Sequence, residues 1–284
     1  MMQRVFFIFL QLIVDKYDAK VINFGKISYK GEKITIFAYM KPTFTIVTVT
    51  WNAASVIQPT LDSIKMQSCT DFEYLLVDGQ STDDTLERVR AAAIGNTRIV
   101  SEPDRGLYDA MNKAMGLAQG EYIIWLNAGD AFAAPDSLAR MAVLAQDRPD
   151  VIYGQTQLVN SERQVVGKRH LTAPEHLTAD SFKRGMLVCH QAFVARREIM
   201  PQYDLQYRFS ADYDWCIKVL KVSQSNAYAG PEPLINFLDE GTTSRNHKAS
   251  LKERYRIMCK NYGTLPTMWR HLGFAIRHLM RKWR

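Results

Sequence analysis

The stretch Phe44-Thr-Ile-Val-Thr-Val-Thr50 decides the fold. Its residues are mostly β-branched, and a continuous run of this kind predicts a strand that is buried on both faces. A helical pattern follows, in which apolar residues from Val56 to Ile64 recur at spacings of three and four, with Ser55 as the expected N-cap. A buried strand followed by an amphipathic helix begins a β-α-β unit.

The same alternation continues along the chain. Further strands are expected at 72–77, 97–100 and 122–126, and helices after the capping residues 81–84 and over 106–118. Repeated β-α-β units imply a mostly parallel sheet with helices on both faces. After Asp150, the sequence predicts shorter strands at 151–153 and 164–168, followed by the segment 190–194. These elements are expected to complete the sheet and to carry the loops that face an acceptor substrate. The sequence therefore predicts an α/β fold of the nucleotide-binding type.

The composition fits one elaborated soluble domain of 284 residues. The four cysteines show no CxxC spacing, which predicts neither a zinc site nor a disulfide framework and indicates a reducing cytoplasm. The net charge of +7 is unevenly distributed, because eleven lysines and arginines from Arg245 onward face one acid, Glu253. That end carries +10 and the rest of the chain −3, so the basic partner surface is expected at the carboxyl end.

Residues 1 to about 40 fit the domain pattern poorly. The apolar run from Val5 to Val14 is too short to span a membrane, and no small-residue cleavage site follows it. Three interpretations stay open: an extra leader or misassigned upstream start, a short interfacial anchor, and an added hairpin. Met40 directly precedes the first strong strand, so a natural product could begin there. We expect the main domain over 41–250 and a basic helical tail over 251–284.

Three acidic residues lie where an expected strand or helix meets a loop: Asp78, Asp130 and Asp212. In an α/β protein, such positions line the ligand crevice. Three acids at this crevice indicate a nucleotide, a metal ion and a base.

The motifs around these acids resemble family 2 glycosyltransferases of the GT-A fold, over roughly residues 43–250. Their order and spacing carry the resemblance, which is closest to enzymes that build colanic-acid-type bacterial exopolysaccharides: Thr-Trp-Asn (50–52), Val-Asp-Gly-Gln-Ser-Thr-Asp (77–83), Ser-Glu-Pro-Asp-Arg-Gly-Leu-Tyr-Asp-Ala-Met-Asn-Lys (101–113), Leu-Asn-Ala-Gly-Asp (126–130), Cys-His-Gln-Ala (189–192) and Ser-Ala-Asp-Tyr-Asp (210–214). The resemblance implies an inverting hexosyltransferase that takes a sugar from a UDP- or GDP-linked donor.

The resemblance assigns the donor to the first half of the chain. It implies that Asp78 binds the nucleotide and that Thr50, Trp51 and Asn52 flank the base. The diphosphate or donor sugar would contact residues that follow the third strand: Arg105, Asp109, Asn112 and Lys113. The alternatives are an Asx-turn for Asp78, a core position for Trp51 and a solvated polar helix face for the last group.

Asp130 matches the last acid of the family's metal motif. Asn127 and Gly129 stand where aspartates are common, so one carboxylate would hold the cation together with diphosphate oxygens and water. This arrangement suits Mg²⁺ or Mn²⁺, which would stabilise the charge of the leaving diphosphate. The alternative is that Asp130 merely caps the helix that follows it.

Inverting transfer requires a base that removes the proton of the acceptor hydroxyl. Asp212 aligns with the family's catalytic aspartate, although Ala211 replaces the usual preceding glutamate. Asp214 would point in another direction on a helix, and the resemblance groups it with His190 and Gln191 near the acceptor or donor sugar. The alternatives are a dipole-stabilising acid for Asp212 and a structural role for His190.

The carboxyl end holds two further features. The segment 236–247 resembles a loop that closes over the nucleotide, where Ser244, Arg245 and His247 would meet the diphosphate; a solvated loop is the alternative. From Leu265 to Arg284, an apolar stripe faces a row of arginines, with tryptophans at both ends, which is typical of an interfacial helix. We therefore expect an enzyme of the cytoplasm that is peripheral on the inner face of the cell membrane, attached to anionic lipid, and that uses a polyprenyl-diphosphate-linked saccharide acceptor.

Other interpretations remain for the tail and for the whole chain. The tail can instead be a packing helix, and no nucleic-acid-binding motif accompanies its charge. A nucleotidyltransferase would need a glycine-rich phosphate loop with a lysine after the first strand, and residues 51–55 do not supply one. A non-catalytic membrane-associated scaffold stays open because Asn127, Gly129 and Ala211 depart from the family pattern.

Overall fold

The structure is a computed structural model that describes residues 22–24, 29–30, 33–34, 38–239 and 247–271. Ahead of the domain, β1 (Ile22–Phe24) pairs with β4 (Ala38–Met40), and β2 (Tyr29–Lys30) pairs with β3 (Lys33–Ile34), both antiparallel. These two pairs form sheets separate from the main one. The apolar run 5–14 lies outside the described residues.

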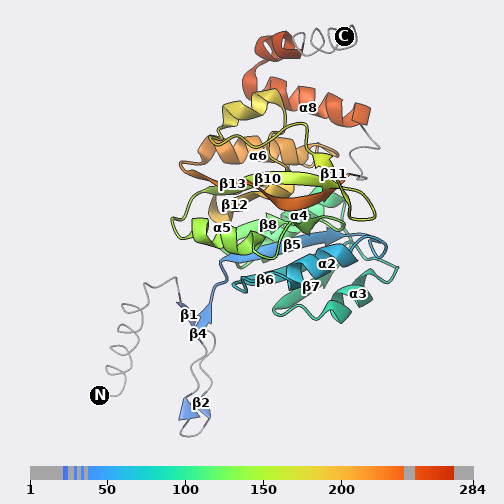
Figure 1. The fold of residues 1–284 in the computed structure, drawn as a ribbon, viewed down its shortest axis with the longest axis vertical. Helices are drawn as coiled ribbons and strands as arrows, with labels where there is room; N and C mark the ends of the chain where they lie inside the picture. Colours follow the sequence, from blue (N-terminus) through green and yellow to red (C-terminus); the bar gives the residue numbers. More distant parts are fainter. Residues whose placement is uncertain (1–21, 25–28, 31–32, 35–37, 240–246, 272–284) are drawn as a thin grey trace, which may run out of the picture.

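The first half of the main sheet is parallel. Its strand order is β7 (Thr97–Ser101), β6 (Phe72–Asp78), β5 (Phe44–Thr50) and β8 (Tyr122–Trp125), and Figure 1 shows these strands in the lower half of the main domain. Every residue of β5 is buried, which agrees with its β-branched sequence. The register aligns Thr50 with Asp78 and Asp78 with Ser101, so the ends of three strands meet at one edge.

The second half of the sheet is mixed. β12 (Phe193–Arg196) joins β8 to β10 (Val151–Val159) by antiparallel pairing, and β13 (Asn226–Leu238) then runs parallel to β10. β9 (Ala131–Phe132) and β11 (Val165–Lys168) pair antiparallel with β13 and β10 respectively. The main sheet therefore contains nine strands among the described residues.

Helices cover this sheet (Figure 1): α2 (Gln58–Lys65), α3 (Thr85–Ala92), α4 (Leu107–Leu117), α5 (Ser137–Ala145), α6 (Ala211–Val222) and α8 (His247–Tyr262). Short 3₁₀ helices occupy Ala179–Arg184, His190–Ala192 and Arg197–Ile199. The expectation that Ser55 caps the first helix is wrong. That helix has Ile57 at its N-cap and Pro59 in its first turn, where proline is tolerated because the first amides have no intrahelical partner.

α8 packs against α6 and the loop before it. Ile257 and Met258 are buried in the common core, and the hydroxyls of Ser250 and Ser210 lie 2.9 Å apart. Glu253 accepts hydrogen bonds from two backbone amides of the 208–209 segment, each at 2.9 Å. The domain boundary predicted at residue 251 thus falls inside a helix that packs on the domain.

The chain is helical again over 264–271, where the described residues end. Leu265, Met268 and Trp269 are exposed on this segment, with 73% of the Trp269 surface accessible. The remainder of the predicted tail helix lies outside the described residues. Within the described part of the chain, no helix combines the length and apolarity needed to cross a membrane.

Candidate active site

Asp78 sits at the aligned ends of β5, β6 and β7 and is completely buried. Its carboxylate accepts hydrogen bonds from Thr50 Oγ1 at 2.9 Å, Ser101 Oγ at 2.7 Å, and both the amide and the hydroxyl of Ser81. Burial raises the pKa of Asp78, but these hydrogen bonds together bring it below its ordinary value. An ionised Asp78 therefore holds three segments of the crevice edge together.

Trp51 follows β5 at the same edge and is 71% exposed, so the core interpretation of this tryptophan is wrong. Asn52 takes a left-handed backbone conformation, with φ of 49°, which asparagine tolerates. Its Oδ1 accepts a hydrogen bond from the Thr82 amide at 2.8 Å, and its own amide donates to Ser81 Oγ. The turn therefore presents the exposed indole of Trp51 at the strand edge where Asp78 forms its hydrogen bonds.

The side chains on α4 and its preceding loop that were predicted to contact the donor bond to other groups of this chain. Asp109 pairs with Arg105 at 3.0 Å, and Lys113 pairs with Glu102 at 2.8 Å. The Asn112 amide group bonds both backbone groups of Tyr203, donating to the carbonyl at 3.0 Å and accepting from the amide at 2.7 Å. Of the four, the Arg105 side chain is the most exposed. Their contact with a donor remains a prediction.

Asp130 closes a turn after β8 in which its amide donates to the Asn127 carbonyl at 3.0 Å. Gly129 has a φ of 98°, the positive value that the third position of a type II turn requires. The Asp130 carboxylate accepts hydrogen bonds from Gln191 Nε2 at 2.7 Å and from the Leu238 amide at 3.0 Å. Burial raises the pKa of Asp130 to about 7, against the effect of these two bonds.

The turn also offers a second oxygen. Asn127 Oδ1 is buried and has no hydrogen-bond partner among the described residues. Carboxylate and amide oxygens are ligands that Mg²⁺ and Mn²⁺ accept. No group of three or more histidine, cysteine, aspartate or glutamate side chains in the described part of the chain could hold a metal ion. The turn thus contains one carboxylate and one amide of the oxygen types that such a cation accepts.

Arg163 is a residue of this site that the sequence did not reveal. It lies in the hairpin between β10 and β11, and its Nη1 donates to the Gly129 carbonyl at 2.6 Å. The partners are 34 residues apart, and nothing in the local sequence marks the arginine. A cation thus stands beside the turn that carries Asp130.

His190 is buried in a cluster of aromatic rings. It stacks on Trp125 with ring centroids 5.9 Å apart, meets Trp215 edge-on, and shares a hydrogen bond of 2.7 Å with the Tyr203 hydroxyl. Burial lowers the pKa of His190 to about 4, although the nearby charge of Asp212 acts in the opposite direction. The imidazole is therefore neutral at pH 7, which favours the structural interpretation of this histidine.

Asp212 and Asp214 lie in the first turn of α6 but differ in their surroundings. Asp212 is half-buried, and its Oδ1 accepts the Tyr213 amide at 2.9 Å and the Tyr108 hydroxyl at 3.2 Å. Its Oδ2 makes no hydrogen bond with any described residue. Asp214 is fully buried, with Lys218 at 2.6 Å and Asn261 at 3.0 Å from its two oxygens.

The predicted closing loop is mostly outside the described residues. Ser244 and Arg245 are not described, and only the backbone of His247 is, at the start of α8.

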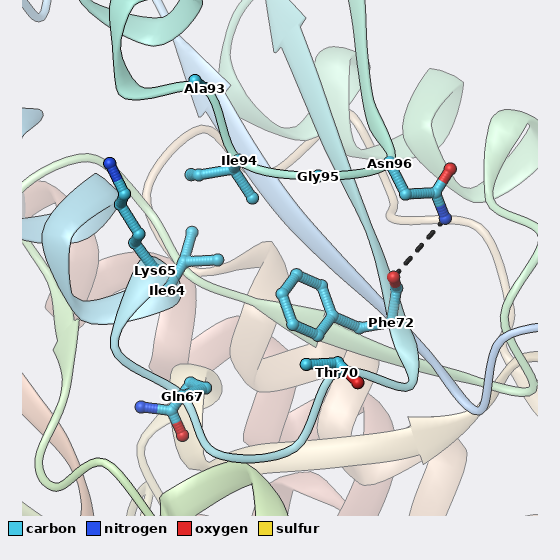
Figure 2. Close-up of a pocket in the computed structure, with 9 residues that line it drawn as sticks. All are labelled: Ile64, Lys65, Gln67, Thr70, Phe72, Ala93, Ile94, Gly95 and Asn96. Atoms are coloured by element: carbon cyan, nitrogen blue, oxygen red, sulfur yellow. Dashed lines mark hydrogen bonds between the residues drawn. The ribbon is translucent and has the colours of Figure 1, made fainter.

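A pocket of about 370 Å³ lies at the end of β6 that is opposite to Asp78. Figure 2 shows Phe72, Ile64 and Ile94 on its walls, with Asn96 Nδ2 donating to the Phe72 carbonyl at 3.4 Å. Phe72 begins β6 and Asp78 ends it, a separation of roughly 20 Å along an extended strand. This pocket is therefore distinct from the crevice that carries the predicted site.

Comparison with known proteins defines the class. Residues 45–203 match the profile of glycosyl transferase family 2. A PGL/p-HBAD biosynthesis glycosyltransferase of Mycobacterium bovis is 38% identical over 251 residues, which cover 85% of this chain and 91% of that protein. The protein is thus a glycosyltransferase. The chain belongs to glycosyl transferase family 2, as its motifs predicted.

More distant proteins share parts of the sequence or the fold. The Escherichia coli UDP-Glc:alpha-D-GlcNAc-diphosphoundecaprenol beta-1,3-glucosyltransferase WfgD is 23% identical over 64% of this chain and 71% of its own. S. aureus TarS 1–349 in complex with UDP-GlcNAc superposes with a TM-score of 0.61 at 20% identity, covering 76% of this chain and 64% of TarS 1–349, less than two thirds of it. The mannosyltransferase PcManGT from Pyrobaculum calidifontis, solved with GDP-Man and Mn2+, gives a TM-score of 0.54 at 17% identity, covering 89% and 71%. These similarities confirm the predicted GT-A fold.

Proposed function

We propose that this chain is an inverting hexosyltransferase that moves a sugar from a UDP- or GDP-linked donor to a lipid-linked saccharide acceptor in bacterial surface or exopolysaccharide biosynthesis. One observation carries the proposal. Among the acids predicted for the site, Asp78, Asp109, Asp130 and Asp214 have both carboxylate oxygens engaged by protein groups, whereas Asp212 keeps Oδ2 without a partner among the described residues. A carboxylate with a free oxygen can receive a proton.

In the proposed reaction, this free oxygen acts as the base. The acceptor hydroxyl oxygen forms a bond to the anomeric carbon from the side opposite the leaving group. The bond from that carbon to the diphosphate oxygen breaks, and its electron pair leaves with the nucleoside diphosphate. Asp212 Oδ2 takes the hydroxyl proton as the new bond forms, so charge and protons balance. Attack from behind inverts the configuration at the anomeric carbon.

The donor side of the crevice supports nucleotide binding. Trp51 presents an exposed aromatic face on which a base can stack, next to the edge organised by Asp78. Asp130 and Asn127 would hold the divalent cation, Mg²⁺ or Mn²⁺, which stabilises the charge on the leaving diphosphate when it is bound. UDP-GlcNAc and GDP-Man in the two structural neighbours agree with this donor class.

The acceptor and the cellular location rest on the relatives and on the tail. The name of WfgD specifies a diphosphoundecaprenol-linked acceptor, which is the class we propose here. Leu265, Met268 and Trp269 expose apolar surface at the start of the 265–284 segment of the basic tail. Exposed tryptophan and leucine beside clustered cations suit shallow insertion into an anionic membrane surface, here the inner face of the cell membrane.

A two-stage assay tests the proposal. UDP- and GDP-sugars are first screened by thermal shift with and without Mn²⁺, and the stabilising donor is then incubated with a polyprenyl-diphosphate-linked saccharide. We expect Mn²⁺-dependent stabilisation by one donor and a product whose new linkage, read by NMR, has the anomeric configuration opposite to that of the donor. A product of retained configuration would overturn inversion. Donor binding without hydrolysis or transfer to any acceptor would favour the scaffold, and release of pyrophosphate from nucleoside triphosphate would favour the nucleotidyltransferase.

A further inference from the structure

Tyr108 links α4 to the predicted base across 104 residues of sequence. It is the second residue of α4, its side chain is buried, and its hydroxyl donates to Asp212 Oδ1 at 3.2 Å. The hydroxyl is the only side-chain donor to this carboxylate among the described residues, because the other bond comes from the Tyr213 amide.

Both of these bonds reach the same oxygen. Tyr108 and the Tyr213 amide occupy Oδ1, and Oδ2 is left free of described partners. A carboxylate held at one oxygen has a fixed orientation, and its other oxygen is the better placed to accept a proton. We propose that Tyr108 is a positioning residue that holds Asp212 by Oδ1 and thereby selects Oδ2 as the atom that receives the acceptor proton. This inference rests on the proposed role of Asp212 as the base.

The surroundings of Tyr108 fix its hydroxyl in place. Its ring stacks on Tyr203, with centroids 5.5 Å apart and planes at 26°. Tyr203 is itself fixed, because Asn112 on α4 bonds both of its backbone groups and His190 bonds its hydroxyl. The motif residues of α4 therefore act on Asp212 through packed rings. This arrangement gives a function to Asn112 that does not require contact with the donor.

Burial favours the neutral form of the titratable groups that surround Asp212. Burial raises the pKa of both tyrosines and of the two nearby cysteines, and lowers that of the histidine; these groups are Tyr108 on α4, Tyr203 in the loop before α6, Cys189 and His190 at the short 190–192 helix, and Cys216 on α6. The charge of Glu253 on α8 also raises the pKa of Tyr108. Deleting the Tyr108 hydroxyl therefore removes the one side-chain hydrogen bond that Asp212 receives from the described residues.

Tyr108→Phe tests the inference through the pH profile of turnover at saturating donor. A hydrogen bond to a carboxylate stabilises its ionised form, so loss of the Tyr108 bond should move the acid limb of the profile upward by about one pH unit. Turnover on the high-pH plateau should fall by about tenfold, because Asp212 is no longer held in the orientation that directs Oδ2 at the acceptor hydroxyl. Tyr203→Phe, which removes the hydroxyl bound to His190, should leave the acid limb in place.

A second variant keeps the hydroxyl and changes its acidity. Difluorotyrosine at position 108 donates a stronger hydrogen bond and should move the acid limb downward, opposite to Tyr108→Phe, so the inference stays testable if the phenylalanine variant fails to fold. Asp212→Asn is measured in parallel. An active Asp212→Asn enzyme would overturn the proposed base itself. An inactive Asp212→Asn enzyme together with unshifted acid limbs in both position-108 variants would overturn the role of Tyr108 alone.

Discussion

Two regions of the crevice hold a carboxylate in opposite ways. At the ends of β5, β6 and β7, hydroxyls and an amide surround Asp78 with four hydrogen bonds and leave it no exposed surface. At the start of α6, an aromatic wall supports Asp212 on one oxygen, and no described residue bonds the other. The difference separates an acid that organises the site from an acid that can exchange a proton.

Asp130 shares features of both regions. Its two oxygens are bonded, as in Asp78, but one of the donors is Gln191, which follows His190 of the aromatic cluster. Its pKa is near neutrality because burial outweighs those bonds, whereas the bonds to Asp78 outweigh burial. Nearby positive charge would favour the ionised form of Asp130, which suits a position beside a cation.

The largest expected effect concerns the aromatic region. His190 has a pKa of about 4 in the folded protein and an ordinary value of 6.5, so the unfolded chain binds more protons between these two pH values. Stability from the neutral imidazole is complete above pH 6.5 and is lost as the pH falls toward 4, by about 3 kcal/mol. Urea unfolding of wild type and His190→Gln at pH 7 and pH 4 should show this extra loss in wild type only. Parallel curves for the two proteins would contradict it.

The next effect concerns Asp130, which shares features of both regions. Asp130→Asn removes the one carboxylate of the 127–130 turn, so Mn²⁺-dependent donor affinity should fall by more than about 100-fold while the fold stays intact. Isothermal titration with the donor, with and without Mn²⁺, measures this change. Asn127→Ala should weaken the metal dependence less, since it removes a neutral oxygen. Equal Mn²⁺-dependent affinity in Asp130→Asn and wild type would exclude the assignment.

The polar region should respond in stability more than in chemistry. Asp78→Asn replaces an acceptor oxygen by a donor and leaves at least one buried hydroxyl or amide unpaired, so the free energy of unfolding should fall by about 1–3 kcal/mol. Turnover at saturating donor should stay within a few-fold of wild type. Thr50→Val, which removes a single bond to Asp78, is the matched control and should cost less. A hundredfold loss of turnover with unchanged stability would break the distinction between the two acids.

The smallest effect concerns the tail. Trp269→Ala should weaken binding to anionic vesicles by about fivefold, because one exposed indole contributes only part of the inserted surface. Stability and transfer to a water-soluble acceptor should not change. Val143→Ala removes an exposed apolar side chain of α5 and serves as the control in the same flotation assay. Equal vesicle binding by the Trp269 variant and wild type would leave this segment of the tail without a membrane role.

The sequence predicted the parallel half of the sheet well because its signals are local. β5 and β6 begin where runs of apolar and β-branched residues begin, at Phe44 and Phe72, and the acids at their ends follow from strand polarity. The start of α2 was missed because Ser55 resembles a cap, whereas the helix begins at Gln58, directly before Pro59.

The partners of the site residues could not be predicted, because they come from distant parts of the chain. Asn112 reads as one polar residue of a surface helix face, yet its amide bonds the backbone of Tyr203, 91 residues away. Tyr108 stands inside a recognised motif without any sign that its hydroxyl meets Asp212. Glu253 is the one acid in the basic tail, and only the packing of α8 shows that it accepts two backbone amides of the 208–209 segment.

The most direct test compares two neighbouring acids on one helix turn. Asp212→Asn and Asp214→Asn are purified, their unfolding midpoints are measured, and transfer is followed at saturating donor and acceptor. We predict that Asp212→Asn keeps its stability and loses about 10² to 10⁴ in turnover, whereas Asp214→Asn, which breaks the buried pair with Lys218, loses stability and keeps most of its turnover. An inactive, stable Asp214→Asn enzyme beside a nearly normal Asp212→Asn enzyme would contradict the account.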